Sequence, residues 1–389
     1  MPPLVPTDEI AARIAAFQAG LTADGIDAAL IVESADLFYL TGTIADAHLV
    51  VPAAGEPLYL VRRDLGRARD ESPLGQVEPL RSLRDLGTAV SDAAGAVTRL
   101  GLELDVLPAA SYLRYARTFP TAELVDCMPA LRRCRIVKSA WELGRIRSAA
   151  DQVRVVFRAI DGLLREGMTD RDLQVEIEYL MRRNGHQGPC RYRGMNGEMY
   201  FGAVLAGPDA AVAAASDTPL GGYGPSPAIG RGPRAGAIVP GAAVTVDIVG
   251  ASDGYLADAT RTCSIGELES PLGEALAVCE TILREIEAIL VPGTPWSRPY
   301  ELGGEIADTA GFGDAWMGAG PSRVTFVGHG LGLEINEPPF LARGFDALLE
   351  PGNVVAVEPK LVFPGIGAVG IENTYAIRAE GGPENLTAT

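Results

Sequence analysis

The stretch "AAVTVDIVGASDGYLADATRTCSIG", residues 242–266, holds two runs of alternating apolar and small or polar residues on either side of "ASDG". Alternation around such a turn sequence predicts a β-hairpin. Two registers are open. A turn centred on residues 252–253 makes Asp247 face Asp258, whereas a turn centred on 253–254 leaves Asp258 one diagonal step from Asp247. Both registers place the two carboxylates side by side on one face.

Two neighbouring aspartates fit a solvated polar face as well as a cation site, so a second observation is needed. The stretch "NVVAVEPKLVFPGIGAVGIENTYAI", residues 353–377, predicts another hairpin, in which Glu358 and Glu372 each lie seven residues from Gly365. A three-residue loop would make the glutamates oppose each other, and a two-residue loop would put them on different faces. This second acidic pair favours the cation site.

One of the three histidines of the chain, His329, lies between glycines in "VGHGLGLEINEPP" (327–339). A lone histidine is usually structural, but flanking glycines permit a close approach of backbone or ligand. Four carboxylates and an imidazole form a plausible set of hard metal ligands. Bridging carboxylates suit two divalent ions that share a water nucleophile.

Composition excludes several classes of protein. The formal net charge of −17 argues against nucleic acid and against anionic membrane surfaces as partners. No apolar run approaches the roughly 18 residues that span a bilayer, and "MPPLVPTDEI" is unlike a secretion signal. Five cysteines without a CxxC pair fit reduced thiols. We therefore expect a cytoplasmic protein.

The length of 389 residues predicts two domains. Residues 1–137 alternate helical and short apolar segments, which is typical of a small α/β domain. A capping box at Ser139 and Glu142 opens a long amphipathic helix, and residues 138–389 combine further helices with antiparallel hairpins. The fold class expected for the whole chain is α+β.

The five candidate ligands, in this order, resemble those of the pita-bread metallopeptidases, in particular the prolidase, aminopeptidase P and creatinase branch. The motifs that carry the resemblance are "GYLADATRT", "GHGLG", "VEP" and "IEN", and upstream "LRRCRIVKSAWELGRIRSAA" and "LFYLTG". The resemblance implies a pita-bread catalytic domain, a homodimer, and two divalent metal ions, with Mn first and Co, Zn or Fe as alternatives. It implies that the metal ligands are Asp247, Asp258, His329, Glu358 and Glu372.

The sequence departs from the family pattern at three places. Asn336 occupies the position of a second histidine, Ala214 or a neighbour replaces a third, and Gly370 stands where an arginine often precedes the last glutamate. We assign catalysis to Glu358 and Asn336.

"CRYRGMNGEMYFG" suggests Arg191, Tyr192 and Arg193 as substrate-binding residues, since arginine binds carboxylates bidentately. A surface or dimer-contact role explains them equally well.

Three functions are compatible with these residues. We favour a dinuclear metallohydrolase that cleaves Xaa-Pro or other short peptides or small amides. The alternatives are a creatinase-like C–N hydrolase or metal-dependent lyase, and a binding protein without catalysis. "GASDG" also matches a serine-hydrolase motif at Ser252, but it predicts a turn between strands rather than the strand–turn–helix that the motif needs.

Overall fold

The computed structural model describes residues 4–197 and 201–389, and the chain forms two compact units. Unit 1 consists of Met1–Arg135 with Gly194–Asn196, and unit 2 consists of Ile136–Arg193 with Gly197–Thr389.

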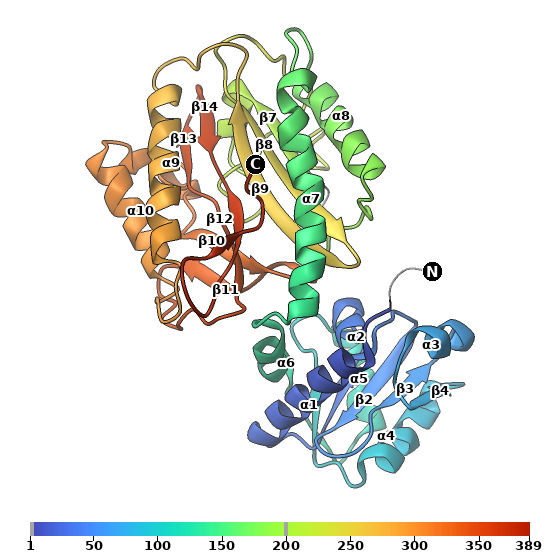
Figure 1. Ribbon diagram of the computed structural model, residues 1–389. Helices are drawn as coiled ribbons and strands as arrows, with labels where there is room; N and C mark the ends of the chain where they lie inside the picture. The colour runs from blue at the N-terminus through green and yellow to red at the C-terminus, as the bar shows by residue number, and fades with distance from the viewer. Residues whose placement is uncertain (1–3, 198–200) are drawn as a thin grey trace. The chain divides into compact units, whose positions relative to one another are not determined.

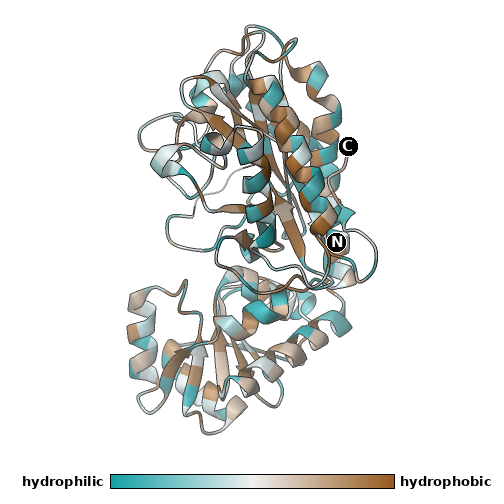
Figure 2. Ribbon diagram, turned by 90° about the vertical axis from the view of Figure 1, so that its left-hand side faces the viewer, coloured by the Kyte–Doolittle hydropathy of each residue, from teal (hydrophilic) through white to brown (hydrophobic). Residues whose placement is uncertain are grey.

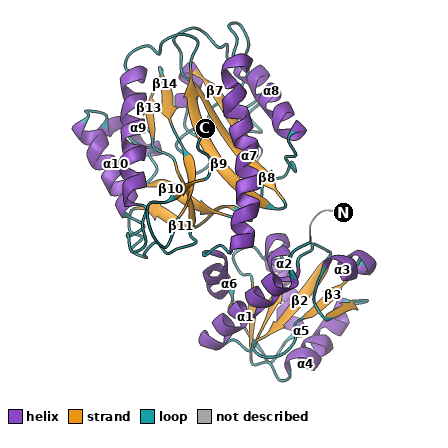
Figure 3. Cartoon of the chain, in the orientation of Figure 1, coloured by secondary structure: helices purple, strands orange, loops and turns teal. Residues whose placement is uncertain are grey.

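Unit 1 is a six-stranded mixed sheet flanked by helices (Figures 1 and 3). The strand order is β4-β3-β2-β1-β5-β6, with antiparallel pairing of β1 to β2 and β2 to β3 and parallel pairing elsewhere. The central strands are apolar and fully buried, as a sheet covered on both faces requires. Its elements are α1 (Thr7–Ala23), β1 (Ala28–Ile31), α2 (Ser34–Thr41), β2 (Ala47–Pro52), β3 (Leu58–Val61), α3 (Leu65–Glu71), β4 (Gln76–Pro79), η1 (Leu83–Asp85), α4 (Leu86–Ala94), β5 (Arg99–Leu102), α5 (Ala109–Thr118), β6 (Glu123–Asp126) and α6 (Met128–Arg135).

Unit 2 contains three antiparallel sheets, ordered β7-β8-β9, β11-β10-β12-β15-β16 and β13-β14. The α/β character of unit 1 and the antiparallel sheets with helices of unit 2 confirm the expected fold class. Its elements are α7 (Ala140–Leu163), α8 (Asp170–Arg183), β7 (Gly202–Ala206), η2 (Gly207–Ala211), β8 (Val244–Ser252), β9 (Tyr255–Cys263), α9 (Leu272–Ile289), α10 (Arg298–Thr309), η3 (Gly313–Ala315), η4 (Gly320–Ser322), β10 (Phe326–Leu331), β11 (Ile335–Ala342), β12 (Val354–Val357), β13 (Lys360–Phe363), β14 (Gly367–Gly370), β15 (Asn373–Ala376) and β16 (Glu384–Asn385).

Side-chain caps define where the two first helices of unit 2 begin. The Ser139 hydroxyl accepts from the Glu142 amide, and the Glu142 carboxylate accepts from the Ser139 amide, so the expected capping box is present at α7. Thr169 and Asp172 form a second box at α8. Among the described residues, no helix has both the length and the apolar character needed to cross a membrane.

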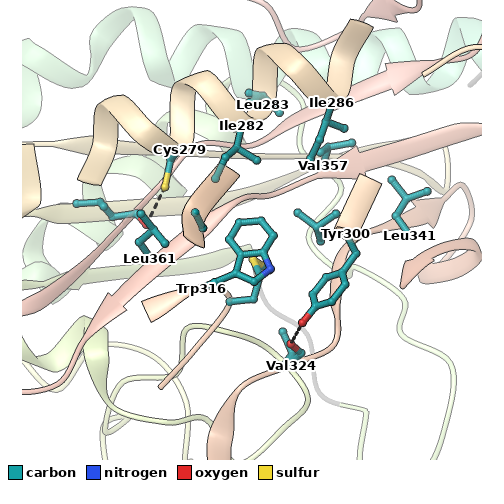
Figure 4. Close-up of a cluster of buried hydrophobic side chains, with 14 of the residues drawn as sticks. Cys279, Ile282, Leu283, Ile286, Tyr300, Trp316, Val324, Leu341, Val357 and Leu361 are labelled. Carbon is teal, nitrogen blue, oxygen red and sulfur yellow. Dashed lines mark hydrogen bonds between the residues drawn. The ribbon is translucent and has the colours of Figure 1, made fainter. Parts of the chain in front are cut away.

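Two apolar cores lie between the sheets of unit 2 and the helices that cover them. One core lies between α7, α8 and the β7-β8-β9 sheet, where a Cβ at Gly250 would lie 2.1 Å from the carbonyl oxygen of Ala149. The other joins α9 and α10 to the strands of the C-terminal half, with Tyr300 next to Trp316 and Ile282 in the same cluster (Figure 4). Hydrophobic residues follow the strands and the helix faces turned toward them (Figure 2). These cores fix the two hairpins that carry the candidate ligands.

Candidate metal centre

The β8–β9 hairpin places two aspartates on one face. Its turn is Asp253-Gly254, and both residues have positive φ, 47° and 88°, as a two-residue hairpin turn requires. Asp247 therefore pairs with Thr260, and Asp258 lies one diagonal step away. The structure selects the second of the two registers that the sequence left open.

A second hairpin brings the two glutamates together. The loop between β13 and β14 has three residues, 364–366, centred on Gly365. The β12–β15 ladder on the other side of the glutamates has the same register. Glu358 and Glu372 consequently fall opposite each other, as the three-residue alternative requires.

Side chains of threonine join the two hairpins. The Thr260 hydroxyl donates to Glu372 Oε2 at 2.6 Å, and the Glu372 amide donates to the Thr260 carbonyl at 3.0 Å. The Thr374 hydroxyl donates to the Asp258 carbonyl at 2.7 Å and accepts from the Asp258 amide at 3.0 Å. These contacts bring both acidic pairs into one cluster.

His329 enters the same cluster from β10. A Cβ at Gly328 would lie 2.2 Å from the carbonyl oxygen of Ala356, and one at Gly330 would lie 2.4 Å from that of Glu337. The flanking glycines therefore allow neighbouring strands to approach. His329 Nδ1 lies 3.1 Å from the Gly330 carbonyl oxygen, which can only accept, so in the neutral ring Nε2 carries the lone pair.

The imidazole faces two of the acids. His329 Nε2 lies 3.9 Å from Asp258 Oδ2 and 3.8 Å from Glu358 Oε1. Burial lowers the pKa of His329 and so favours the neutral ring that a metal requires.

Two buried oxygens of the cluster have no protein partner. Asp258, Glu358 and Glu372 are at most 5% exposed, and Asp258 Oδ1 and Glu372 Oε1 make no hydrogen bond within the described residues. Burial and neighbouring carboxylates raise the pKa of Asp258 well above its ordinary value and that of Glu372 to about 8.

One group of three side chains has the spacing of a metal site. Ligand atoms of Asp258, His329 and Glu372 lie within 4.8 Å of one another. Carboxylate oxygens with one imidazole suit Mn, Co, Zn or Fe ions. The unpartnered oxygens and the neutral imidazole therefore fit a divalent cation.

Lys360 is a member of the cluster that the sequence analysis missed. Its Nζ lies 2.5 Å from Glu358 Oε2, 3.2 Å from Asp247 Oδ2 and 3.6 Å from Glu372 Oε2. Burial alone would lower the pKa of Lys360, but these carboxylates outweigh burial and raise it well above the ordinary value. The sequence does contain a signal for this role, because Lys360 is a charged residue at the start of an apolar strand and lies two positions after the candidate ligand Glu358.

The other predicted site residues gather at the start of β11 rather than on the acid hairpins. Tyr192 bridges to Ile335, and Asn336 follows with a φ of 60°. Arg193 Nη1 lies 3.5 Å from Glu334 Oε1, and both side chains are at most 10% exposed. The carbonyl of Arg191 accepts from the Ile335 amide at 2.9 Å. The structure thus brings Arg191, Tyr192 and Arg193 next to Asn336.

Ser252 lies at the end of β8 and pairs with Tyr255 across the turn. The chain continues as strand β9, so the strand–turn–helix of a serine-hydrolase nucleophile does not occur here. The other two histidines are buried and hydrogen-bonded, His186 to the Val249 carbonyl and His48 to the Tyr115 hydroxyl. The serine-hydrolase alternative loses its support.

Comparison with known proteins identifies families that match both parts of the chain. Residues 144–379 match metallopeptidase family M24, and residues 13–137 match the Creatinase/Prolidase N-terminal domain. A probable dipeptidase PepE of Mycobacterium tuberculosis is 29% identical over 96% of this chain and 93% of the relative. A Xaa-Pro dipeptidase of Pyrococcus horikoshii is 25% identical over 94% of each chain.

Solved structures share the fold over nearly the whole chain. The prolidase from Pyrococcus horikoshii OT3 superposes with a TM-score of 0.82 at 22% identity, covering 97% of this chain and 98% of that one. The Xaa-Pro dipeptidase from Bacillus anthracis gives a TM-score of 0.83 at 24% identity, with 98% of both chains covered. The named dipeptidases favour a peptidase over the creatinase-like or lyase alternative. Since the family match spans more than half of the chain, this protein is a metallohydrolase that belongs to metallopeptidase family M24, with a pita-bread fold and a creatinase/prolidase-type N-terminal domain.

Proposed function

We propose that this protein is a manganese-dependent peptidase that hydrolyses Xaa-Pro dipeptides or similar short peptides and small amides. The observation that carries the proposal is the convergence of four carboxylates and His329, with two buried oxygens left without partners. Family M24 membership implies divalent metal ions. The Xaa-Pro class is supported by relatives named as Xaa-Pro dipeptidases.

The proposed ligands are Asp247, Asp258, His329, Glu358 and Glu372, with two ions at full loading. Bound ions supply the Lewis acidity that polarises a carbonyl and activates water for attack. Buried carboxylates that lack hydrogen-bond donors are expensive to retain unless a cation compensates them. Glu358, within 3.8 Å of the imidazole, is proposed both as a ligand and as the acceptor of the proton from the attacking water.

Asn336 and the segment Arg191–Arg193 are proposed to position the substrate. Tyr192 bridges to Ile335 at the start of β11, next to Asn336, which lies seven residues after His329, and this proximity supports the role. Asn336 can donate a hydrogen bond but cannot transfer a proton at neutral pH. We therefore expect slower turnover of Xaa-Pro dipeptides than of substrates whose leaving group needs less protonation.

The test is an assay of purified protein, freed of metal and reloaded with Mn²⁺, against Xaa-Pro dipeptides and a panel of small amides. Metal-dependent cleavage of at least one Xaa-Pro dipeptide supports the proposal. Asn336→His should raise that rate, because a proton-transferring group typically contributes about 10²–10⁴-fold. Failure of both proteins, loaded with Mn²⁺, to cleave any Xaa-Pro dipeptide or small amide would contradict the assignment of substrate.

We also propose a cytoplasmic homodimer whose N-terminal domain ends at residue 137 and whose catalytic domain is 138–389. The cysteines are all free, which fits a reducing compartment. Size-exclusion chromatography with light scattering tests the dimer, and separate expression of the two segments tests the boundary.

A further inference from the structure

Lys360 places a positive charge inside the acid cluster. Its side chain is 1% exposed, and its Nζ lies within 3.6 Å of an oxygen of each of three acids, Asp247, Glu358 and Glu372. A buried ammonium with several carboxylates around it occupies the kind of position that a metal ion otherwise takes.

The backbone and the opposite strand hold Lys360 in this place. Its carbonyl accepts from the Met317 amide at 3.0 Å, so the start of β13 is fixed. A Cβ at Gly370, its partner on β14, would lie only 2.5 Å from Lys360 Cγ. The lack of a side chain at Gly370 therefore makes room for the lysine stem.

On the other side of the cluster, two carboxylate oxygens have no hydrogen-bond donor among the described residues. Asp258 Oδ1 and Glu372 Oε1 are buried without a hydrogen-bond partner, and they belong to the same donor group as His329. The cluster consequently has two unlike corners. Asp258, His329 and Glu372 form an open corner, and Asp247 and Glu358 form a corner that contains the ammonium.

We propose that Lys360 is a tethered cation in the place of a second metal ion, so that the first divalent ion binds at the open corner and a second binds only by displacing the ammonium. The proposal rests on the proposed function only in requiring that the cluster binds divalent ions. A divalent ion beside a retained ammonium is repelled, and an ammonium that leaves must give up its carboxylate contacts. The second ion should therefore bind on the order of 100-fold or more weakly than the first.

The test is a Mn²⁺ titration of metal-free full-length protein by equilibrium dialysis, with bound metal counted by elemental analysis. The wild type should bind one ion tightly and a second only at much higher Mn²⁺. Lys360→Met should bind two ions with affinities within about tenfold of each other, since no ammonium opposes the second. Adding Asp247→Asn to Lys360→Met should weaken the second ion again and leave the first unchanged.

A second buried lysine provides the matched control. Lys138 Nζ lies 2.8 Å from Glu337 Oε1 and its side chain is also 1% exposed, but it pairs with a carboxylate outside the cluster. Lys138→Met should keep the wild-type metal count. If Lys360→Met does not fold, as judged by circular dichroism, Lys360→Gln replaces it, and the wild-type titration stands by itself.

Two results would overturn the inference. One is wild-type protein that binds two Mn²⁺ ions with equal affinity, and the other is a folded Lys360 variant whose second ion binds no more tightly than in wild type. Failure of the wild type and of every variant to bind Mn²⁺ would instead refute the proposed metal-dependent function.

Discussion

Two clusters of buried charged residues, one in each unit, differ in whether hydrogen bonds and ion pairs within the protein compensate their carboxylates. In unit 1, Arg135 Nη1 lies 2.7 Å from Asp36 Oδ1, and Glu103 accepts hydrogen bonds from the Val32 and Glu33 amides at 2.7 and 3.0 Å. Burial and the neighbouring Asp36 raise the pKa of Glu103, which favours its neutral form. We call this group the Arg135 cluster.

The acid cluster of unit 2 has four carboxylates around one lysine and two oxygens without partners. Buried acids are thus common to both units. What distinguishes the candidate metal centre is the excess of negative charge together with the unpartnered oxygens. The following predictions test that distinction, from the largest expected effect to the smallest.

Asp258→Ala should lower kcat/KM by at least about 10³-fold, or roughly 4 kcal/mol, because the variant loses a carboxylate of the open corner. Metal content should fall while far-ultraviolet circular dichroism remains that of the wild type. Unchanged activity at low metal concentration would contradict the assignment of Asp258.

Asp36→Ala should lower the free energy of unfolding by about 3 kcal/mol, because Arg135 is left as a buried charge without this carboxylate. Denaturant unfolding measures the loss, and the Mn²⁺ count of the folded variant should equal that of the wild type. A variant that stays as stable as the wild type but loses metal would reverse the roles of the two clusters.

Removal of metal should destabilise the wild type by about 2.7 kcal/mol relative to protein at a metal concentration 100 times the Kd. Thermal unfolding with and without a chelator measures this difference. Asp258→Ala should show little response to the chelator, whereas Asp36→Ala should respond as the wild type does.

Unit 1 should instead respond to acid through His48. Burial lowers the pKa of His48 to about 4 in the folded protein, from about 6.5 in the unfolded chain. Between pH 6.5 and pH 4 His48 is protonated in the unfolded chain but stays neutral in the folded protein. The free energy of unfolding therefore decreases as pH falls from 6.5 toward 4. From pH 7 to pH 5 this loss is about 2 kcal/mol, and His48→Gln should lack that part of the pH dependence.

Ser252→Ala should change activity and stability least, by less than about 0.5 kcal/mol, since Ser252 ends a strand beside a turn. A steady-state assay beside the wild type checks this. An inactive, folded variant would restore the serine-hydrolase alternative.

Much of the site could be predicted from the sequence because successive side chains of a β-strand point to opposite faces of the sheet. Once the Asp253-Gly254 turn and the loop centred on Gly365 are known, the facing of the four acids follows. The sequence left both loop choices open, since its alternation fits either register.

Contacts between distant segments could not be predicted in the same way. The threonine bonds that join the hairpins link residues more than 100 positions apart in the chain. The position of Lys360 depends on the missing side chain of Gly370 on the facing strand, and a lone lysine near an acid is common in sequences. The pairing of Arg193 with Glu334 joins residues 141 positions apart, and no local pattern in the sequence indicates that contact.

The three-residue loop at 364–366 has a consequence for how this chain can diverge. Surface loops ordinarily tolerate insertions and deletions better than the strands they connect. Here a change of one residue in loop length would shift the facing strand by one position, so that Ile371 or Asn373 would stand where Glu372 stands. We therefore expect the length of this loop to tolerate change as little as the ligands do, although its residues are separated from them by a whole strand.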